Sequence, residues 1–268
     1  GHSSMPKNGA LPVTVPGAPS AWAVMSERFG SLALTESMNY AIEYAASGFP
    51  VSPMVARAWQ QSFERYVDVL NETHFKPWFD TFAPAGRAPR AGELWRSPAH
   101  AATLASIASD GAQSFYRGAL AEKIVACVKG AGGYLEMADL AAYQPQWVDP
   151  ISTNYRGYDV WEIPPNGHGL VALLALNLLK GFDFTERDAL LTQHRQIEAI
   201  KLAFADGQAH IADPAHMRRS VQDLLSDAYA DERRKLLGAR ASLPAPGQPP
   251  LGGTVYLSTA DDQGNMVS

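Results

Sequence analysis

Apolar side chains recur every three to four residues along most of this chain, which is the spacing that predicts amphipathic helices. The first such stretch is preceded by Ser20, a candidate N-cap, and ends at Gly30. A second stretch begins at Thr35, another candidate cap, and ends at Gly48. The apolar faces of these two predicted helices consist of Trp22, Met25 and Phe29 and of Met38, Ile42 and Ala45.

Two serine-proline pairs mark the starts of the next helices. Ser52-Pro53 and Ser97-Pro98 each place a capping hydroxyl before a proline, whose missing N–H costs nothing at the first helical position. The intervening residues 76–98, KPWFDTFAPAGRAPRAGELWRSP, are rich in Pro, Gly and Arg. That composition predicts a long irregular connection.

The only cysteine, Cys127, lies in the helical pattern ALAEKIVACVKG. A single cysteine excludes an intramolecular disulfide and a multi-cysteine metal site. Its spacing from Leu120, Ile124 and Val128 puts it on the expected buried stripe of a helix. A core thiol is therefore favoured over a nucleophile, and a buried thiol is compatible with the cytoplasm, the periplasm or secretion.

The period changes after residue 150. Alternating residues in ISTNYRGYDVWE, broken by Arg156-Gly157, predict a β-hairpin. The following residues 170–179 are apolar nearly all round, so this helix should occupy the protein's centre. The run is far too short to cross a bilayer, and no membrane segment is predicted.

Two later helices precede a very different segment. HRQIEAIKLAFAD predicts a helix whose polar face carries Glu198 and Asp206. Ser226 is a candidate cap for a further helix that stops at Gly238. Residues 238–253, GARASLPAPGQPPLGG, then predict an exposed, flexible connector. The segments that follow are a predicted strand, turn and start of a returning strand: TVYLSTA, DDQGN and MVS. Because the chain ends within this hairpin, we expect it to be part of a longer precursor.

Composition narrows the possible functions. With 46% hydrophobic and 18% charged residues, the chain is typical of globular proteins, and its net charge of -5 argues against a nucleic-acid surface. The sequence has no GxSxG, HExxH or GxxxxGK[ST] motif. Its seven histidines are scattered; His210 and His216, the nearest pair, are separated by Asp213-Pro214, so no metal site is predicted. NGHG before residue 170 is interpreted as a strand-to-helix turn rather than an anion site.

The junction between Gly253 and Thr254 carries the most specific chemistry. A flexible connector leading into a strand that begins with Thr is what a self-processing enzyme with an N-terminal nucleophile needs. The Thr254 hydroxyl can attack the Gly253 carbonyl, and the freed α-amine of Thr254 can then act as general base for its own hydroxyl. By local sequence alone, a threonine that merely opens a hairpin remains the simpler interpretation.

A family resemblance favours the catalytic interpretation. PLGGTVYLSTADDQGNMVS resembles the start of the small subunit in gamma-glutamyltranspeptidases, where a catalytic Thr leads a strand into an Asp-x-x-Gly-Asn turn. LPVTVPGAPSAWAVMSERFGSLAL, AIEYAASGFPVSP, EAIKLAFAD and LLSDAYADERRKLL resemble large-subunit segments in the same order, as does the block from residue 115 to residue 169. Here Thr254-Val255-Tyr256 replaces the family's usual Thr-Thr-His, which indicates a divergent subfamily.

The resemblance implies an α+β fold, in which this chain is the mostly helical central portion of a four-layer αββα N-terminal-nucleophile hydrolase. Residues 1–253 would be a large-subunit portion and residues 254–268 the start of the small subunit, both from one precursor. Thr254 would take a gamma-glutamyl group and pass it to an amino acid, a peptide or water, without metal or organic cofactor. The carboxylate-binding and oxyanion groups of the family would lie outside residues 1–268, so the chain alone is expected to be inactive.

Two alternatives remain open. A related acylase of the cephalosporin or glutaryl type would keep the fold and nucleophile but change the substrate. A non-catalytic helical scaffold would keep neither activity nor processing.

Overall fold

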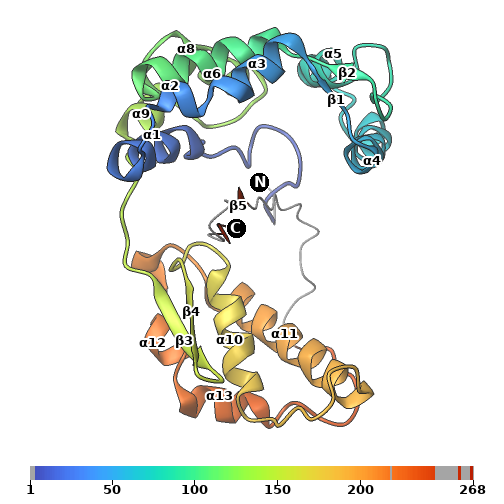
Figure 1. Ribbon diagram of the computed structural model, residues 1–268, viewed down its shortest axis with the longest axis vertical. Coiled ribbons are helices and arrows are strands. Elements are labelled where there is room, and N and C mark those ends of the chain that lie inside the picture. The colour runs from blue at the N-terminus through green and yellow to red at the C-terminus, as the bar shows by residue number, and fades with distance from the viewer. Residues whose placement is uncertain (1–3, 218, 245–258, 261–265, 268) are drawn as a thin grey trace. The chain divides into compact units, whose positions relative to one another are not determined.

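The computed structural model describes residues 4–217, 219–244, 259–260 and 266–267. The chain divides into two compact units, Gly1–Gln146 and Trp147–Ser268 (Figure 1). Helices dominate both units, and the strands form short antiparallel pairs. This agrees with the expected α+β composition, whereas the four-layer arrangement stays a prediction.

The first unit is mainly helical. Its two short strands, β1 (Phe49–Pro50) and β2 (Leu94–Trp95), pair with each other. Its helices are α1 (Ala18–Phe29), α2 (Leu34–Ser37), α3 (Asn39–Ser47), α4 (Pro53–Val69), the 3₁₀ turn η1 (Thr73–Phe75), α5 (Lys76–Phe82), α6 (Pro98–Asp110), α7 (Gln113–Arg117), α8 (Ala119–Gly130) and α9 (Met137–Ala142).

Both serine-proline helix starts are confirmed, with different local chemistry. The Ser52 hydroxyl accepts a hydrogen bond from the Val55 N–H at 3.3 Å and so caps α4. Ser97 precedes α6, but its hydroxyl pairs with His100 Nδ1 at 2.6 Å instead of capping the helix.

The predicted caps of the first two helices are wrong. Helix α1 begins at Ala18, so Ser20 lies inside it, is buried, and donates through its hydroxyl to the Gly17 carbonyl at 2.9 Å. The second predicted helix is divided at Met38 into α2 and α3, and Thr35 lies within α2. Gly30 and Gly48 do end helices, as expected, and Gly48 does so with φ of +98°.

The expected irregular connection over residues 76–98 is partly wrong, because α5 and β2 fall within it. Pro77 is placed in the first turn of α5, where its missing N–H is harmless. Aromatic packing supplies the reason that the helix forms: the Trp59 ring meets Phe82 and Trp95 edge-on, and its Nε1 donates to the Phe82 carbonyl at 2.9 Å. Tertiary contacts thus override a sequence rich in Pro and Gly.

Cys127 is exposed, which corrects the expectation of a core thiol. The buried stripe of α8 is formed by Ala121, Val125 and Val128, at spacings of four and three residues. Leu120 and Ile124 are only partly buried at the edge of this cluster. The expected stripe was rotated by about one residue, or roughly 100° around the helix, which is enough to turn the thiol outward.

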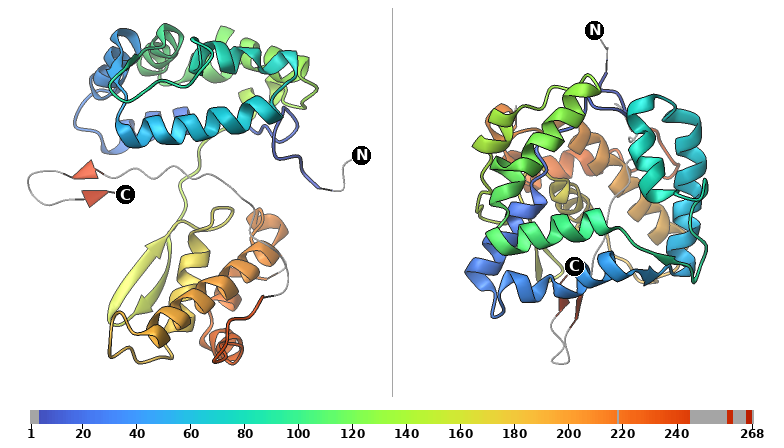
Figure 2. Two further views of the ribbon diagram at one scale, coloured as in Figure 1. Left: turned by 90° about the vertical axis from the view of Figure 1, so that its right-hand side faces the viewer. Right: turned by 90° about the horizontal axis from the view of Figure 1, so that it is seen from above.

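In the second unit, a hairpin packs against helix α10 (Figure 2). The strands β3 (Ile151–Tyr155) and β4 (Tyr158–Glu162) pair as predicted. Arg156 and Gly157, with φ of +55° and +88°, form the turn between them. The remaining elements are α10 (Gly169–Leu179), α11 (Leu190–His210), the 3₁₀ turn η2 (Pro214–His216), α12 (Val221–Leu224), α13 (Asp227–Arg234), β5 (Thr259–Ala260) and β6 (Met266–Val267).

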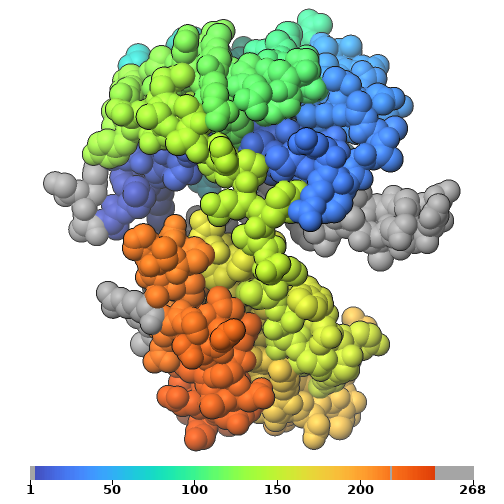
Figure 3. Space-filling view, turned by 90° about the vertical axis from the view of Figure 1, so that its left-hand side faces the viewer, coloured from blue at the N-terminus to red at the C-terminus, as the bar shows by residue number. Residues whose placement is uncertain are grey.

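Helix α10 forms the core of this unit, as its apolar sequence predicts. It packs against α11, β3 and α13, and it is largely hidden beneath its neighbours in the surface view (Figure 3). Its buried residues are Leu170, Val171, Leu173, Leu174, Ala175, Asn177, Leu178 and Leu179. The buried Asn177 is satisfied, because Thr153 donates to its side-chain oxygen and its amide donates to the Leu225 carbonyl at 2.7 Å.

The last predicted elements are also present. Ser226 caps α13 by accepting from the Tyr229 N–H at 3.3 Å. Strands β5 and β6 pair antiparallel, with Thr259 opposite Val267, as expected for the strands after the connector, whereas residues 254–258 and the expected turn at 261–265 lie outside the described residues. Within the described part of the chain, no helix is long and apolar enough to cross a membrane.

Candidate active site

The two residues predicted to carry the chemistry, Gly253 and Thr254, lie outside the described residues. The structure describes the chain up to Pro244 on one side of them and strand β5 on the other. The part of the connector that the structure describes ends at Pro244, and its contacts with α11 are given below.

Glu198 and Asp206 are buried, which corrects their placement on a polar helix face. Glu198 is 3% exposed and Asp206 is 7% exposed. Each is paired with a cation: Glu198 with Lys201 at 2.5 Å, and Asp206 with Arg233 at 2.8 Å. Burial of a carboxylate is tolerated only when donors of this kind satisfy it.

The Glu198 carboxylate accepts hydrogen bonds from two directions. Lys201 Nζ reaches one oxygen, and the Ser242 N–H and hydroxyl reach the other at 3.1 and 3.0 Å. Burial alone raises the pKa of this carboxyl, but the donors from Lys201 and Ser242 outweigh that effect and lower the pKa below its ordinary value. Glu198 is therefore an ionised structural anchor rather than a proton donor.

Asp206 occupies a separate ion pair two turns further along α11. Arg233 Nε donates to it at 2.9 Å, in addition to the contact of Nη2. Burial, followed by the negative charge of Asp206, raises the pKa of the neighbouring Tyr229 hydroxyl. This pairing ties α13 to α11. Arg233 contacts both carboxylate oxygens of Asp206, so this carboxylate has a structural role rather than that of a general base.

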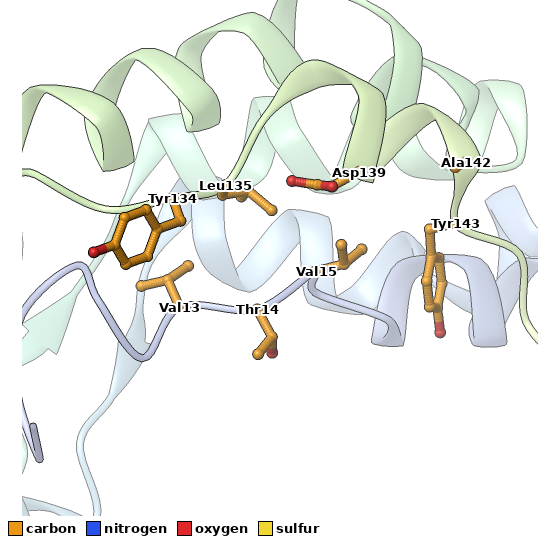
Figure 4. A pocket seen from close by; sticks show the side chains of 8 residues that line it. All are labelled: Val13, Thr14, Val15, Tyr134, Leu135, Asp139, Ala142 and Tyr143. Atoms are coloured by element: carbon orange, nitrogen blue, oxygen red, sulfur yellow. The ribbon is translucent and has the colours of Figure 1, made fainter. Parts of the chain in front are cut away.

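The first unit carries a pocket of about 440 Å³ (Figure 4). Tyr134 and Tyr143 lie at opposite ends of a row formed by Val13, Thr14 and Val15. Asp139 is the carboxylate in this lining, and it accepts from the Glu136 N–H at 2.8 Å, which occupies it in capping α9. The remaining lining residues are Leu135 and Ala142. Because its lining contains no nucleophile next to a base, the pocket has no catalytic arrangement of its own.

The histidine-containing loop after α11 behaves as a polar turn. Asp213 accepts from the Ala215 N–H at 2.9 Å, as expected for a local backbone cap. Among the described residues, no group of three His, Cys, Asp or Glu side chains is placed to hold a metal ion.

The family model for Gamma-glutamyltranspeptidase matches residues 1–268, the whole chain. This chain belongs to the gamma-glutamyltranspeptidase family. The match extends the resemblance seen around residue 254 to every segment described above.

Curated relatives include proenzymes with different named activities. The chain is 35% identical over 271 residues to the glutathione hydrolase-like YwrD proenzyme of Bacillus subtilis, covering 100% of this chain and 50% of that protein. It is 32% identical over 275 residues to the oxamate amidohydrolase proenzyme of Klebsiella pneumoniae, covering 100% of this chain and 51% of that protein. The chain therefore spans about half the length of these gamma-glutamyltranspeptidase-family relatives.

Similar solved structures include enzymes with different names. The cephalosporin acylase of Bacillus halodurans superimposes with a TM-score of 0.89 and 55% identity, over 98% of this chain and 48% of that chain. The gamma-glutamyltranspeptidase of Helicobacter pylori gives 0.77 and 27% identity, over 93% and 72%. These two structures share the fold of this chain and carry different enzyme names.

Proposed function

We propose that this chain is part of a precursor that cleaves itself between Gly253 and Thr254, and that Thr254 then acts as the nucleophile of a gamma-glutamyl hydrolase or transferase. The family match over the whole chain is the observation that carries the proposal. The proenzyme names of the relatives support the processing step. The resemblance of PLGGTVYLSTADDQGNMVS to the start of the family's small subunit supports Thr254 as the counterpart of the catalytic threonine.

The bonds made and broken in the processing step belong to the two residues at the junction. Thr254 Oγ attacks the Gly253 carbonyl carbon, the peptide nitrogen takes the hydroxyl proton as the C–N bond breaks, and an ester joins the two residues. Water hydrolyses this ester and leaves a carboxylate on Gly253 and a free amine and hydroxyl on Thr254. The amine, with an ordinary pKa of roughly 7.7–8.0, then serves as general base for the hydroxyl.

The catalytic cycle repeats this chemistry on a substrate amide. Thr254 Oγ attacks the gamma-glutamyl carbonyl, the amine of the donor leaves with a proton, and a gamma-glutamyl ester of Thr254 forms. Water, an amino acid or a peptide amine then takes the acyl group and restores the hydroxyl. No metal or organic cofactor enters the proposed cycle.

The proposed cut differs from the boundary between the compact units. The units meet at Gln146–Trp147, more than 100 residues before Thr254. The larger product, which ends at Gly253, would therefore contain nearly all helices of both units, and the smaller product would begin just before β5.

The processing proposal is tested by intact-mass measurement of the full-length precursor. The wild type is expected to yield two pieces, with Thr254 as the amino terminus of the smaller one. Thr254→Ala is expected to remain one chain, whereas Thr254→Ser keeps a hydroxyl and should still cleave. A small piece that begins at another residue would refute Thr254 as the nucleophile, and an uncut wild type would favour a non-catalytic scaffold.

A second candidate activity is cleavage of another acyl amide. The 55% identity to a cephalosporin acylase and the relation to acylase ACY 1 of Pseudomonas favour it. The discriminating experiment compares a gamma-glutamyl anilide with a glutaryl amide on the processed full-length enzyme, with Thr254→Ala as the blank. A larger kcat/KM for the glutaryl amide would replace the gamma-glutamyl assignment, while leaving the proposed nucleophile in place.

A further inference from the structure

Residues His194 and Glu198 lie one turn apart on α11 and bond to the chain that leads towards the proposed cleavage site. His194 Nε2 pairs with the Gly238 carbonyl at 2.9 Å, and since a carbonyl only accepts, the ring nitrogen donates. Glu198 holds Ser242 as described above. Residues four apart on a helix share a face, so one face of α11 holds both ends of residues 238–242, a seat with two points of contact.

We propose that this seat, which we name the α11 anchor (His194, Glu198 and Lys201), fixes the start of the connector and makes Glu198 a positioning residue for self-cleavage at Gly253–Thr254. The inference rests on the proposed processing function and deepens it. Glu198 acts through Ser242 and does not touch the scissile bond in this proposal.

The burial of Glu198 gives the first argument. Two of the donors to this carboxylate come from Ser242, 44 residues later in the chain, and both reach the same oxygen. If Ser242 left, that oxygen would be left without these donors at a position that is 3% exposed. Charge-assisted hydrogen bonds in such surroundings are among the stronger ones, so the carboxylate favours the seated connector.

The character of the connector gives the second argument. Residues 239–243 are exposed, as the density of Pro and Gly in the connector predicts. Ser242 supplies the side-chain and backbone hydrogen bonds that join the described residues 239–244 to α11. A segment with no packed face of its own is thus held at one defined point.

Chain length sets the size of the expected effect. Roughly 11 residues separate Ser242 from Gly253, and they span at most about 40 Å when fully extended. If Ser242 is released while His194 still holds Gly238, the free chain before Gly253 grows to about 15 residues. The local concentration of the cleavage site near α11 then falls about 1.6-fold. If both contacts are lost, the free length from the end of α13 is about 19 residues and the fall is about 2.3-fold.

The test measures the first-order rate of self-cleavage in full-length precursor variants. Glu198→Gln removes the charge that both donors recognise, leaves the His194–Gly238 contact in place, and is expected to slow cleavage about 1.6-fold. Ser242→Ala removes the hydroxyl at an exposed position and should slow cleavage, whereas Ser242→Thr keeps the hydroxyl and should restore the wild-type rate. Asp206→Asn is the matched control, because it alters the other buried carboxylate of α11 without touching the connector.

Wild-type rates in Glu198→Gln and Ser242→Ala would overturn the anchor, as would equal slowing in Asp206→Asn. Hydrogen exchange of peptides covering residues 236–244 supplies a readout that does not require cleavage. In the uncut Thr254→Ala precursor, Glu198→Gln should speed exchange of the Ser242 amide, while Asp206→Asn should not. Unchanged exchange in Glu198→Gln refutes the anchor; an uncut wild-type precursor refutes the proposed function instead.

Discussion

At the residue scale, three carboxylates each join separate parts of the chain. Glu198 joins α11 to the connector, Asp206 joins α11 to α13, and Glu93 joins the two sides of the loop that precedes β2. The first two are buried and the third is partly exposed, at 39% of its side chain. Removing the charge of Glu198 or Asp206 should therefore lower the free energy of unfolding more than removing the charge of Glu93.

Glu93 is expected to titrate far below an ordinary glutamate. Arg87 donates to both of its oxygens at 2.9 Å, the Arg90 N–H donates to it as well, and the pKa of Glu93 falls to about 2. Because the folded pKa is lowered, the contribution to stability is present above the unfolded value of about 4.5 and is lost as the pH falls towards 2.

Arg87→Gln should raise the pKa of Glu93 towards its ordinary value, since the side-chain donor is its largest cause. A carboxyl titration followed by NMR measures this, with Glu93→Gln used to assign the resonance. High salt should shrink the shift because the pair is partly exposed. A midpoint that is the same with and without Arg87 would contradict the prediction.

Asn177→Ala is expected to lower the free energy of unfolding by about 2–4 kcal/mol, because it leaves both a buried hydroxyl and a carbonyl without their partner and opens a cavity. The partners concerned are Thr153 and the Leu225 carbonyl. Asn154→Ala, which changes an exposed amide of the same hairpin, should cost less than about 1 kcal/mol. Urea denaturation measures both, and equal losses would show that burial is not what matters here.

The burial of Glu198 and Asp206 could not be predicted from their residue type. Both lie near the small, buried side chains of Ala199, Ala203 and Ala205 on α11. A carboxylate on such a buried face needs hydrogen-bond donors. Ser242 donates to Glu198 and Arg233 to Asp206, and both donors come from distant parts of the chain. The periodicity of α11 does not indicate which distant residue will donate to Glu198 or to Asp206.

At the scale of elements, packing decides where apolar pattern alone is ambiguous. Helix α10 and the hairpin β3–β4 were predicted because their patterns are long, regular and bounded by Gly or Pro. Helix α5 was missed because its seven residues stand in a stretch rich in Pro, Gly and Arg, which predicts a loop, whereas aromatic contacts from α4 and β2 stabilise a helix there. The rotation of α8 that exposes Cys127 has the same cause, since neighbours select which of two adjacent stripes is buried.

Leu170→Ala is expected to destabilise the second unit by about 2–5 kcal/mol, because its side chain is fully buried between α10 and its neighbours. Leu190→Ala makes the same chemical change at the start of α11, where the leucine is 87% exposed, and should cost less than about 0.5 kcal/mol. Thermal or urea unfolding of both variants measures the difference. Similar losses at the two positions would contradict the central place of α10.

At the scale of the whole molecule, the chain consists of two compact units with a short extended segment around Trp147. Residues 143–150 contain Pro145 and Pro150 and have no helix or strand, which is the composition expected of a linker. The division expected from the sequence lies at Gly253–Thr254, where the processing chemistry is expected. Covalent division and compact folding are different properties, so the two boundaries need not coincide.

Limited proteolysis with chymotrypsin is expected to cut early after Trp147, which is 52% exposed within this extended segment. Two fragments that part near residue 147 should appear before the helices are degraded. Trp147→Ala should delay this cut and leave other sites unchanged, as judged by the masses of the fragments. A first cut inside α10 or α11 would contradict the division into units.

The order of elements in the second unit also has a kinetic consequence. Strand β3 pairs with β4, α10 packs on both, and α11 packs on α10, so each element meets a neighbour in sequence. Chains whose contacts are local search fewer conformations and fold faster than chains that must first close long loops. During synthesis, this nucleus can therefore assemble as soon as α11 has been translated, before Ser242 is available to it. The connector would then bind to a surface that is already folded.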